Sequence, residues 1–443
     1  MLNTYQLHQN DREVIARNLG LSLDAFDKLV ESANNAYEVI KALGPFYGRE
    51  DIKDPTFRIT AEPVSLPSGA RQQLTQFGND FYALAKILHK LPESHSVSLG
   101  DGLDFKIPAT WRIDAILDEN GLIKVNEIEG VDSASALIIA EQQAYNLQPI
   151  EESTAAHIIP TLKSMCSKHE GKECRLALIR VNVAINPHTP NALRFINFLQ
   201  DLSKGELKVD LLDENEINTG QIKPDWNIYC GVINETPISP KGLKRLGIRE
   251  TQIFSAGNYN VLGNKGIFAL LFDESLDGFW EEGIGVDRLL RLRKLLIKSS
   301  FIKSLAELKK AKIEGKVVKV SWAGNNMTLI NRSKGVAIPE GLLEQSSEER
   351  WKDLEDLLKQ EVKIIAQDYV RPARIKAYLR KKGTNLEPVE WYNRVCVKYV
   401  CKGHPNLKAS SPEIALTGVE VTLGPDIIPA GRKCAFTAGK FVD

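Results

Sequence analysis

The segment that most constrains the fold of this chain is residues 111–130, whose sequence is typical of a β-hairpin. Two runs rich in apolar residues flank a central Asn-Gly pair (120–121), and Asn-Gly is the strongest short-range signal for a hairpin. A two-residue loop at this pair determines which residues face each other across the two strands. A four-residue loop over residues 118–121 is the alternative, and it would set Arg112 against Glu127.

The two-residue loop places four charged side chains on one face of the hairpin, because side chains alternate along a strand. In this register Asp114 lies opposite Glu127. Two residues further along, Arg112 lies opposite Glu129. Directly opposed carboxylates repel each other, so this placement favours a cation between them, such as Mg²⁺ bound together with substrate phosphates. The segment alone leaves a second interpretation open, in which these residues form an ordinary solvated face.

The overall composition argues against several classes of partner. Lys plus Arg and Asp plus Glu each number 57 in the 443 residues, so the formal net charge is zero. A neutral chain offers no bulk attraction to nucleic acid or to an anionic membrane surface, and we expect neither as a partner. At roughly 150 residues per domain, the length predicts two or three domains.

The cysteines and the first residues indicate a cellular location. The six cysteines form no C-x-x-C pair, which argues against a zinc site and favours free thiols in a reducing cytosol. The start of the chain lacks the basic and apolar regions of a signal peptide, and no apolar run reaches the roughly 20 residues that span a bilayer. We therefore expect a cytoplasmic protein.

Helical and strand-forming patterns alternate along the remainder of the chain. Residues 1–95 have mostly the apolar spacing of helices. Strands alternating with helices over residues 174–260 predict a small parallel α/β unit, and the absence of G-x-G-x-x-G there argues against a dinucleotide site. Residues 261–313 are expected to be helical over 266–272, 286–298 and 304–312, and the residues after 316 are rich in strand-forming segments.

Two lysines stand at places where proteins hold anions. Lys319 lies in an apolar strand followed by a short loop that contains Gly324, and a lysine so placed can neutralise a phosphate that backbone N–H groups surround. Lys265 precedes a helix, whose first N–H groups and dipole favour anions. Taken singly, each is better explained as a lysine that reaches solvent.

Two other segments have a functional and a structural interpretation. Residues 367–370 end a buried strand, where backbone groups can pair with an adenine ring, although many strands end in this way. Ser133 and Ser135 follow the acidic hairpin, and they either contact phosphates or substrate or cap the next helix.

The order and spacing of these features, taken together, favour a functional interpretation. R-x-D, a turn and E-x-E are followed by a loop of small residues and Glu-Gln-Gln-Ala-Tyr. Far downstream come N-K-x-x-x-x-x-L, then V-V-K-V with a Gly/Asn loop, then I-I-A-Q-x-Y-V. Over about residues 108–440 this series resembles the ATP-grasp ligases of permuted topology, in particular the synthetase domain of glutathionylspermidine synthase. The eukaryotic glutathione synthetases are similar more distantly.

The resemblance implies an α+β or α/β fold of the ATP-grasp kind with permuted topology. Four parts follow from it: a helical N-terminal region (1–105), a metal-binding hairpin and helix (106–173), the small α/β unit (174–260) and a nucleotide-binding part (261–443).

The resemblance also implies roles for individual residues, position by position. The implied Mg²⁺ ligands are Asp114, Glu127 and Glu129, the last standing where the family usually has asparagine. The implied contact to the transferred phosphate is Arg112. The implied ATP-binding residues are Lys265, Lys319, Gly324, Gln367, Asp368, Tyr369 and Val370, and the implied substrate-binding residues are Ser133 and Ser135.

Two departures from the family pattern concern the substrate and the activity. The loop after Lys319 is shorter than the family's glycine-rich stretch and lacks its Arg-Glu pair. Residues 130–133 do not reproduce the family's Asp-Thr-Pro pattern.

The function implied is ligation of a carboxylate to an amine at the expense of ATP. An acyl phosphate forms and is then displaced by the amine, so the enzyme would need ATP and Mg²⁺, expected as two ions, and small-molecule or peptide substrates. Two alternatives remain: a non-catalytic binding protein, which the shortened loop suggests, and a small-molecule kinase.

Overall fold

The structure is a computed structural model of the 443-residue chain. It describes residues 9–41, 58–96, 99, 107, 110–129, 138–139, 142, 144–145, 158–163, 174–180, 189–213, 227–230, 253–255, 261–322, 336–337, 348–380, 386–401, 412–423 and 434–442.

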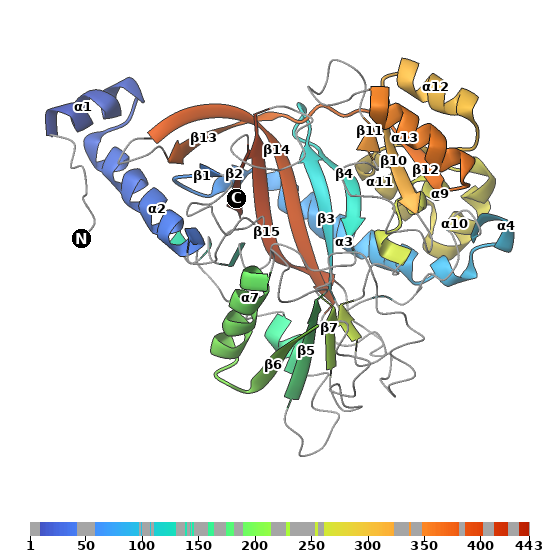
Figure 1. The fold of residues 1–443 in the computed structure, drawn as a ribbon, viewed down its shortest axis with the longest axis horizontal. Coiled ribbons are helices and arrows are strands. Elements are labelled where there is room, and N and C mark those ends of the chain that lie inside the picture. Colours follow the sequence, from blue (N-terminus) through green and yellow to red (C-terminus); the bar gives the residue numbers. More distant parts are fainter. Residues whose placement is uncertain are drawn as a thin grey trace.

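A mixed sheet of twelve strands organises the described part of the chain, with helices on its faces (Figure 1). Its main path runs β1-β16-β15-β14-β3-β8-β7-β5-β6, while β13 pairs with β14, β2 with β16 and β4 with β3. The strands are β1 (Arg58–Ile59), β2 (Val64–Leu66), β3 (Thr110–Leu117), β4 (Ile123–Glu129), β5 (Cys174–Arg180), β6 (Leu207–Asp213), β7 (Asn227–Cys230), β8 (Ile253–Ser255), β13 (Arg374–Arg380), β14 (Leu386–Cys401), β15 (Pro412–Thr422) and β16 (Cys434–Phe441).

The strands from 174–260 form the parallel unit that the alternating pattern predicted. β5 pairs in parallel with β6 and with β7, and α7 (Thr189–Leu202) lies between β5 and β6 in the chain. The unit does not form a sheet of its own, because β8 continues in parallel from β7 to β3, where Thr110 pairs with Ser255. β3, β14, β15 and β16 pair with one another in antiparallel fashion, so a run of antiparallel strands continues the parallel run of β6, β5, β7 and β8.

A second, antiparallel sheet of four strands has the order β11-β10-β12-β9. Its strands are β9 (Ser299–Ile302), β10 (Val317–Trp322), β11 (Val336–Ala337) and β12 (Lys363–Gln367). One face packs on α12 (Leu305–Ile313) and α13 (Glu348–Lys359), where Val318, Ile364 and Trp351 belong to one buried cluster. The Ser304 hydroxyl caps α12 by accepting a hydrogen bond from Glu307 N at 3.2 Å.

The three helices expected within residues 261–313 are present as α9 (Gly266–Leu271), α11 (Val286–Leu295) and α12, but the sequence patterns did not predict the strand β9 between the last two. The helical pattern ends with α11, and the next residues pair with β12, so that Ile302 faces Ile364 and Ser299 faces Gln367. A four-residue strand has too few positions to show a period of two, and its partner lies about sixty residues later in the chain. Tertiary pairing therefore decided this element.

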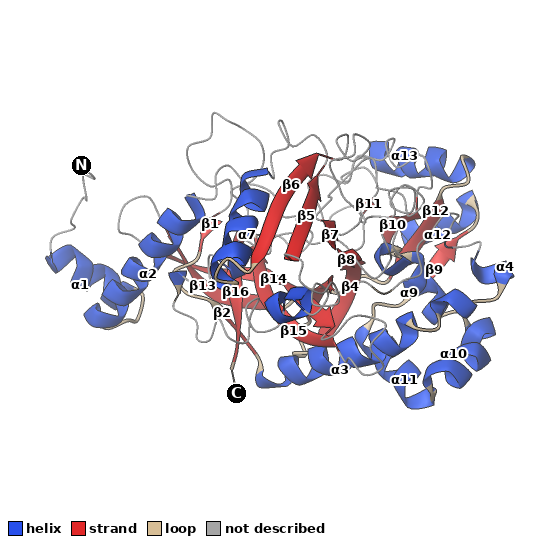
Figure 2. Ribbon diagram, turned by 90° about the horizontal axis from the view of Figure 1, so that it is seen from below, coloured by secondary structure: helices blue, strands red, loops and turns tan. Residues whose placement is uncertain are grey.

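Helices on one side of the large sheet enclose the main core. Figure 2 shows α3 (Ser68–Ala85), α10 (Asp277–Ile284) and α11 together on that side. The rings of Trp111 and Tyr399 stack at 4.3 Å between centroids, and the Tyr399 hydroxyl donates to Leu74 O at 2.7 Å. Gly78 in α3 lies so close to Tyr399 that a Cβ there would approach the ring to 2.6 Å.

The N-terminal region is helical in large part, but it also contributes to the large sheet. Its helices are α1 (Gln9–Asn18), α2 (Leu23–Lys41), α3 and α4 (Glu93–Ser96). β1 and β2, which the sequence patterns did not predict, pair in parallel with β16 from the far end of the chain. Within the described residues, no helix combines the length and the apolar character that a membrane crossing requires.

Candidate functional site

The hairpin of β3 and β4 confirms the predicted pairing of its charged residues. Arg112 pairs with Glu129, and Asp114 pairs with Glu127. The predicted loop of two residues is wrong, however, and so is the four-residue alternative. Leu117 pairs with Ile123 and Asp118 N donates to Leu122 O at 2.9 Å, which leaves a three-residue loop over 119–121.

Two local features produce this hairpin. Gly121 has φ +74°, the left-handed conformation that closes a three-residue loop, and Asp118 Oδ1 accepts hydrogen bonds from Asn120 N and Leu122 N, each at 2.9 Å. The longer loop shifts the register by one residue, and a β-bulge at Asn126 shifts it back before Glu127. Asp114 therefore faces Glu127, and Arg112 faces Glu129, as predicted, because the extra loop residue and the bulge cancel.

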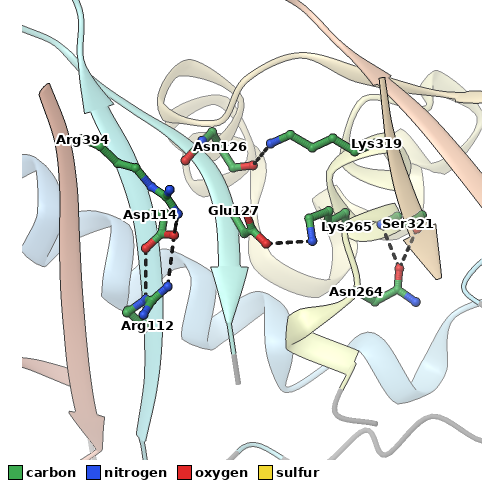
Figure 3. Close-up of polar contacts among 10 residues, drawn as sticks. Arg112, Asp114, Asn126, Glu127, Asn264, Lys265, Lys319, Ser321 and Arg394 are labelled. Carbon is green, nitrogen blue, oxygen red and sulfur yellow. Dashed lines mark hydrogen bonds and ion pairs between the residues drawn. The ribbon is translucent and has the colours of Figure 1, made fainter. Parts of the chain in front are cut away.

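The bulge connects the large sheet to the small one. Lys319 Nζ on β10 donates to the backbone carbonyl of Asn126 at 3.1 Å (Figure 3). Val318, the neighbour of Lys319, packs against α12 and α13, so the alternation of side chains directs Lys319 to the other face of the small sheet. That face lies toward β4, and the candidate site is located between them.

A second lysine joins Lys319 from the helix α9 (Gly266–Leu271). Lys265, the residue before α9, forms an ion pair with Glu127, with Nζ 2.7 Å from Oε1. Asn264 anchors this point: its amide donates to Leu99 O at 2.6 Å, and its Oδ1 accepts from Gly266 N at 2.8 Å and from Ser321 Oγ at 2.9 Å. The start of α9 is thereby attached to β10, and the two predicted phosphate-binding lysines lie beside one carboxylate.

Electrostatics couples these groups. Burial by itself would raise the pKa of Glu127, but Lys265, Lys319 and Arg394 outweigh it and hold that pKa well below its ordinary value. Burial lowers the pKa of Lys319 to about 8, with Glu127 opposing the shift and Lys265 and Arg394 adding to it. Lys319 thus lies close to titration at neutral pH, which makes its charge sensitive to a bound anion.

The Asp114 carboxylate is completely buried and is shared by two arginines. Arg112 approaches it with Nε 3.0 Å from Oδ1 and Nη2 3.1 Å from Oδ2. Arg394 on β14 also donates to Oδ2. Burial alone would raise the pKa of Asp114, but the charges of Arg112 and Arg394 keep it below its ordinary value.

Gln367, the first residue of the predicted adenine-binding segment, lies on the same face of the small sheet as Lys319. Gln367 is paired with Val317, is 1% exposed, and its Nε2 has no hydrogen-bond partner among the described residues. Asp368 uses its backbone N–H on Lys298 O at 2.9 Å, and its carboxylate lies 3.2 Å from Lys316 Nζ. Tyr369 and Val370 follow and are half-buried.

Several predicted residues cannot be placed as side chains. Ser133, Ser135 and Gly324 lie outside the described residues, and for Glu129 only the backbone pairing is described. Sequence reasoning missed Asn126, Asn264, Ser321 and Arg394. Asn264 directly precedes Lys265, and Arg394 lies in a predicted strand. Neither residue type, however, predicts a contact with a partner so far away in the chain.

The described side chains of the site carry more positive than negative charge. Ion pairs join Arg112 and Arg394 to Asp114 and Lys265 to Glu127, while Lys319 donates to the backbone carbonyl of Asn126 beside Glu127. Four basic side chains thus lie around two acidic ones. An excess of buried positive charge suits an anion such as a phosphate chain. No group of three or more metal-ligating side chains occurs among the described residues. Such a preformed cage is unnecessary for Mg²⁺, which proteins usually bind through one or two carboxylates together with substrate phosphates.

Comparison with known proteins identifies a shared fold. No protein-family model and no curated protein sequence matches the chain. A glutathione synthetase-like effector from Globodera pallida, solved in its apo form, superposes with a TM-score of 0.57 at 12% identity, over 93% of this chain and 97% of that chain. A putative gamma-glutamylcysteine synthetase from Methylobacillus flagellatus gives a TM-score of 0.36 at 11% identity, over 81% and 84% of the two chains. The first likeness shows that this mixed α/β chain shares its fold with the Globodera pallida protein.

Proposed function

We propose that this chain is an ATP-dependent ligase that joins a carboxylate to an amine through an acyl phosphate, releasing ADP and phosphate. One observation carries the proposal: Lys265 and Lys319, which lie apart in the sequence, meet at adjacent residues of β4, where Lys265 pairs with Glu127 and Lys319 donates to the carbonyl of Asn126. These are the two lysines that the resemblance assigns to the phosphates of ATP. The fold shared with a glutathione synthetase-like protein supports the same conclusion.

The nucleotide would lie between the small sheet and the β3–β4 hairpin. Its phosphates would contact Lys265 and Lys319, and its base would reach the end of β12, where the buried Gln367 amide has an unused donor among the described residues. The backbone N–H of Asp368 already donates a hydrogen bond to the carbonyl of Lys298. Recognition of the base is therefore expected to use Gln367 and the residues after Asp368.

Mg²⁺ would enter this site together with the phosphates. Glu127 is partly exposed, with 20% of its side chain accessible, and Glu129 lies two residues along the same strand. We propose these two carboxylates as ligands, with Lys265 moving from Glu127 to a phosphate oxygen. When bound, Mg²⁺ would neutralise phosphate charge. Asp114, the third ligand that the resemblance implies, is already contacted by Arg112 and Arg394.

The residues of the chain mainly orient the reactants and compensate charge in this reaction. A substrate carboxylate oxygen attacks the γ-phosphorus and ADP leaves. The amine nitrogen then attacks the acyl carbon, phosphate leaves, and the nitrogen loses its proton. Arg112 would contact the transferred phosphoryl group, and Ser133 and Ser135 are proposed to contact substrate.

We extend the proposal to the organisation of the chain. The hairpin that holds the acidic residues precedes both lysines, and the small sheet lies in the C-terminal half. This order supports a permuted ATP-grasp fold with the divisions 1–105, 106–173, 174–260 and 261–443. A cytoplasmic location is part of the same proposal.

A direct test is the release of ADP in mixtures of carboxylates and amines with ATP and Mg²⁺. ADP accompanied by an amide product supports a ligase, while ADP with a phosphorylated product and no amide indicates a kinase. ATP binding without turnover indicates a binding protein. Failure of the protein to bind ATP in the presence of Mg²⁺ refutes the proposal.

A further inference from the structure

Arg394 brings a second guanidinium to the site from a strand about 280 residues away from the hairpin. β14 pairs with β3 so that Cys396 lies opposite Asp114, which makes Arg394 the diagonal neighbour of Asp114 on the same face. Such neighbours lie roughly 7–8 Å apart at the backbone, within reach of a long side chain. Arg394 accordingly donates to Asp114 Oδ2.

Arg394 also belongs electrostatically to the group that contains the lysines. Its charge acts on Glu127 and on Lys319 as well as on Asp114. Figure 3 shows Arg394 and Arg112 on opposite sides of the Asp114 carboxylate, with Glu127 on the next strand, β4, and Lys265 beyond it. The guanidinium pair and the lysine pair therefore border one polar region.

The surroundings of Asp114 differ from those of a metal ligand. Arg112 and Arg394 both donate to Oδ2, Arg112 Nε lies 3.0 Å from Oδ1 as an ion pair without a hydrogen bond, and the side chain is 0% exposed. An Mg²⁺ ion at about 2.1 Å from either oxygen would lie against a like-charged guanidinium and would have to displace it. Glu127 is different, because its side chain is partly exposed and its partner is a flexible lysine.

We propose that Arg394 is a second oxyanion-binding arginine of this site, and that Asp114 is a positioning residue that orients Arg112 and Arg394 rather than a metal ligand. The identity of the anion as the transferred phosphoryl group rests on the proposed function. Two guanidinium groups fixed by one carboxylate present planar, permanently charged donors without losing side-chain freedom on binding. This arrangement suits the three oxygens of a phosphoryl group in transfer.

The first test measures anion binding without metal or nucleoside. Isothermal titration calorimetry with tripolyphosphate in EDTA should show binding to the unmodified protein and roughly tenfold weaker binding to Arg394→Gln, as expected for the loss of a charge-assisted hydrogen bond. Arg394→Lys should recover part of the affinity. Arg58→Gln is the matched control, since Arg58 also forms a part-buried ion pair with a residue of β14, Glu387, but lies outside the site. It should bind tripolyphosphate like the unmodified protein.

The second test separates positioning from metal binding. In ATP titrations at varied Mg²⁺, Glu127→Gln should need more Mg²⁺ for half-maximal binding, whereas Asp114→Asn should keep the Mg²⁺ requirement and lose affinity for tripolyphosphate. If Asp114→Asn does not fold, the Arg394 variants decide the proposal by themselves. Equal Mg²⁺ shifts in the two acid variants would overturn the role given to Asp114.

The outcomes distinguish this inference from the proposed function. Tripolyphosphate that fails to bind the unmodified protein, or binds Arg394→Gln equally well, overturns the inference. The other outcome is that tripolyphosphate binds in an Arg394-dependent way but ATP with Mg²⁺ does not bind. This result refutes the ligase proposal and supports the anion site.

Discussion

Lys319 Nζ donates a hydrogen bond of 3.1 Å to the backbone carbonyl of Asn126, the bulged residue of β4. A bulge leaves one residue outside the regular ladder of the sheet, and here the carbonyl of that residue binds the lysine of another sheet. This contact places Lys319 next to Glu127, so one backbone irregularity helps to bring the basic and acidic groups of the site together.

Replacing Lys319 should weaken nucleotide binding. We expect Lys319→Met to lower ATP affinity roughly tenfold or more, because a hydrogen bond that involves a charged group contributes about 1.5–3 kcal/mol. Calorimetric titration of ATP with Mg²⁺ measures this. Lys124→Met is the control, since Lys124 lies on β4 and also donates to a backbone carbonyl, Lys294 O at 2.6 Å, but outside the site. An equal loss in both variants would contradict the assignment.

The pKa of Lys319 predicts a dependence of anion binding on pH. That pKa is lowered to about 8, so the folded protein loses the charge of Lys319 above this value. Tripolyphosphate affinity should therefore fall as the pH rises through about 8, and this fall should be absent in Lys319→Met. The free energy of unfolding should change in the opposite direction. Burying the charged lysine destabilises the folded protein, and the unfolded chain keeps this proton up to the ordinary lysine pKa. The destabilisation therefore becomes smaller as the pH rises above 8. Calorimetric titrations over a pH series test the binding effect.

The loss of folding stability at acidic pH should depend on Glu127. Its pKa is held well below the ordinary value, so its contribution to stability is present above about pH 4.3 and is lost as the pH falls further. We expect Glu127→Gln to be less stable than the unmodified protein at pH 7 and to lose less stability on acidification. Urea unfolding at pH 7 and at acidic pH measures both. Parallel losses in the two proteins would show that Glu127 does not contribute.

The close packing of α3 on β14 predicts the effect of a single methyl group. Gly78→Ala should destabilise the fold by about 1–3 kcal/mol, because the new Cβ would lie 2.6 Å from the Tyr399 ring in a closely packed core. Gly69→Ala in the first turn of the same helix is the control, since its nearest neighbour is a flexible Gln73 side chain at 3.7 Å. Urea midpoints should fall for the first variant only, and a similar fall for both would point to a general effect of the helix.

The hairpin shows how far local sequence determined this site. The alternating strands and the central Asn-Gly pair were sufficient to predict that Asp114 faces Glu127 and that Arg112 faces Glu129. The loop length and the bulge at Asn126 were not predicted: the loop is set by Gly121 and the Asp118 side chain, and the carbonyl of the bulged residue binds Lys319 of another sheet. Local patterns specify which face of a strand a side chain occupies. A backbone irregularity such as a bulge also depends on the residues that contact it.

By itself, the sequence determined the elements with strong periodicity or composition: the parallel α/β unit, the strands that hold Lys319 and Gln367, and the candidate phosphate-binding lysines. The tertiary structure alone decided which distant residues meet. β9 formed because β12 pairs with it, and Arg394 entered the site because β14 lies beside β3. The physical reason is that a short strand or a single arginine has little local preference, so its place depends on pairing and on charges contributed from elsewhere in the chain.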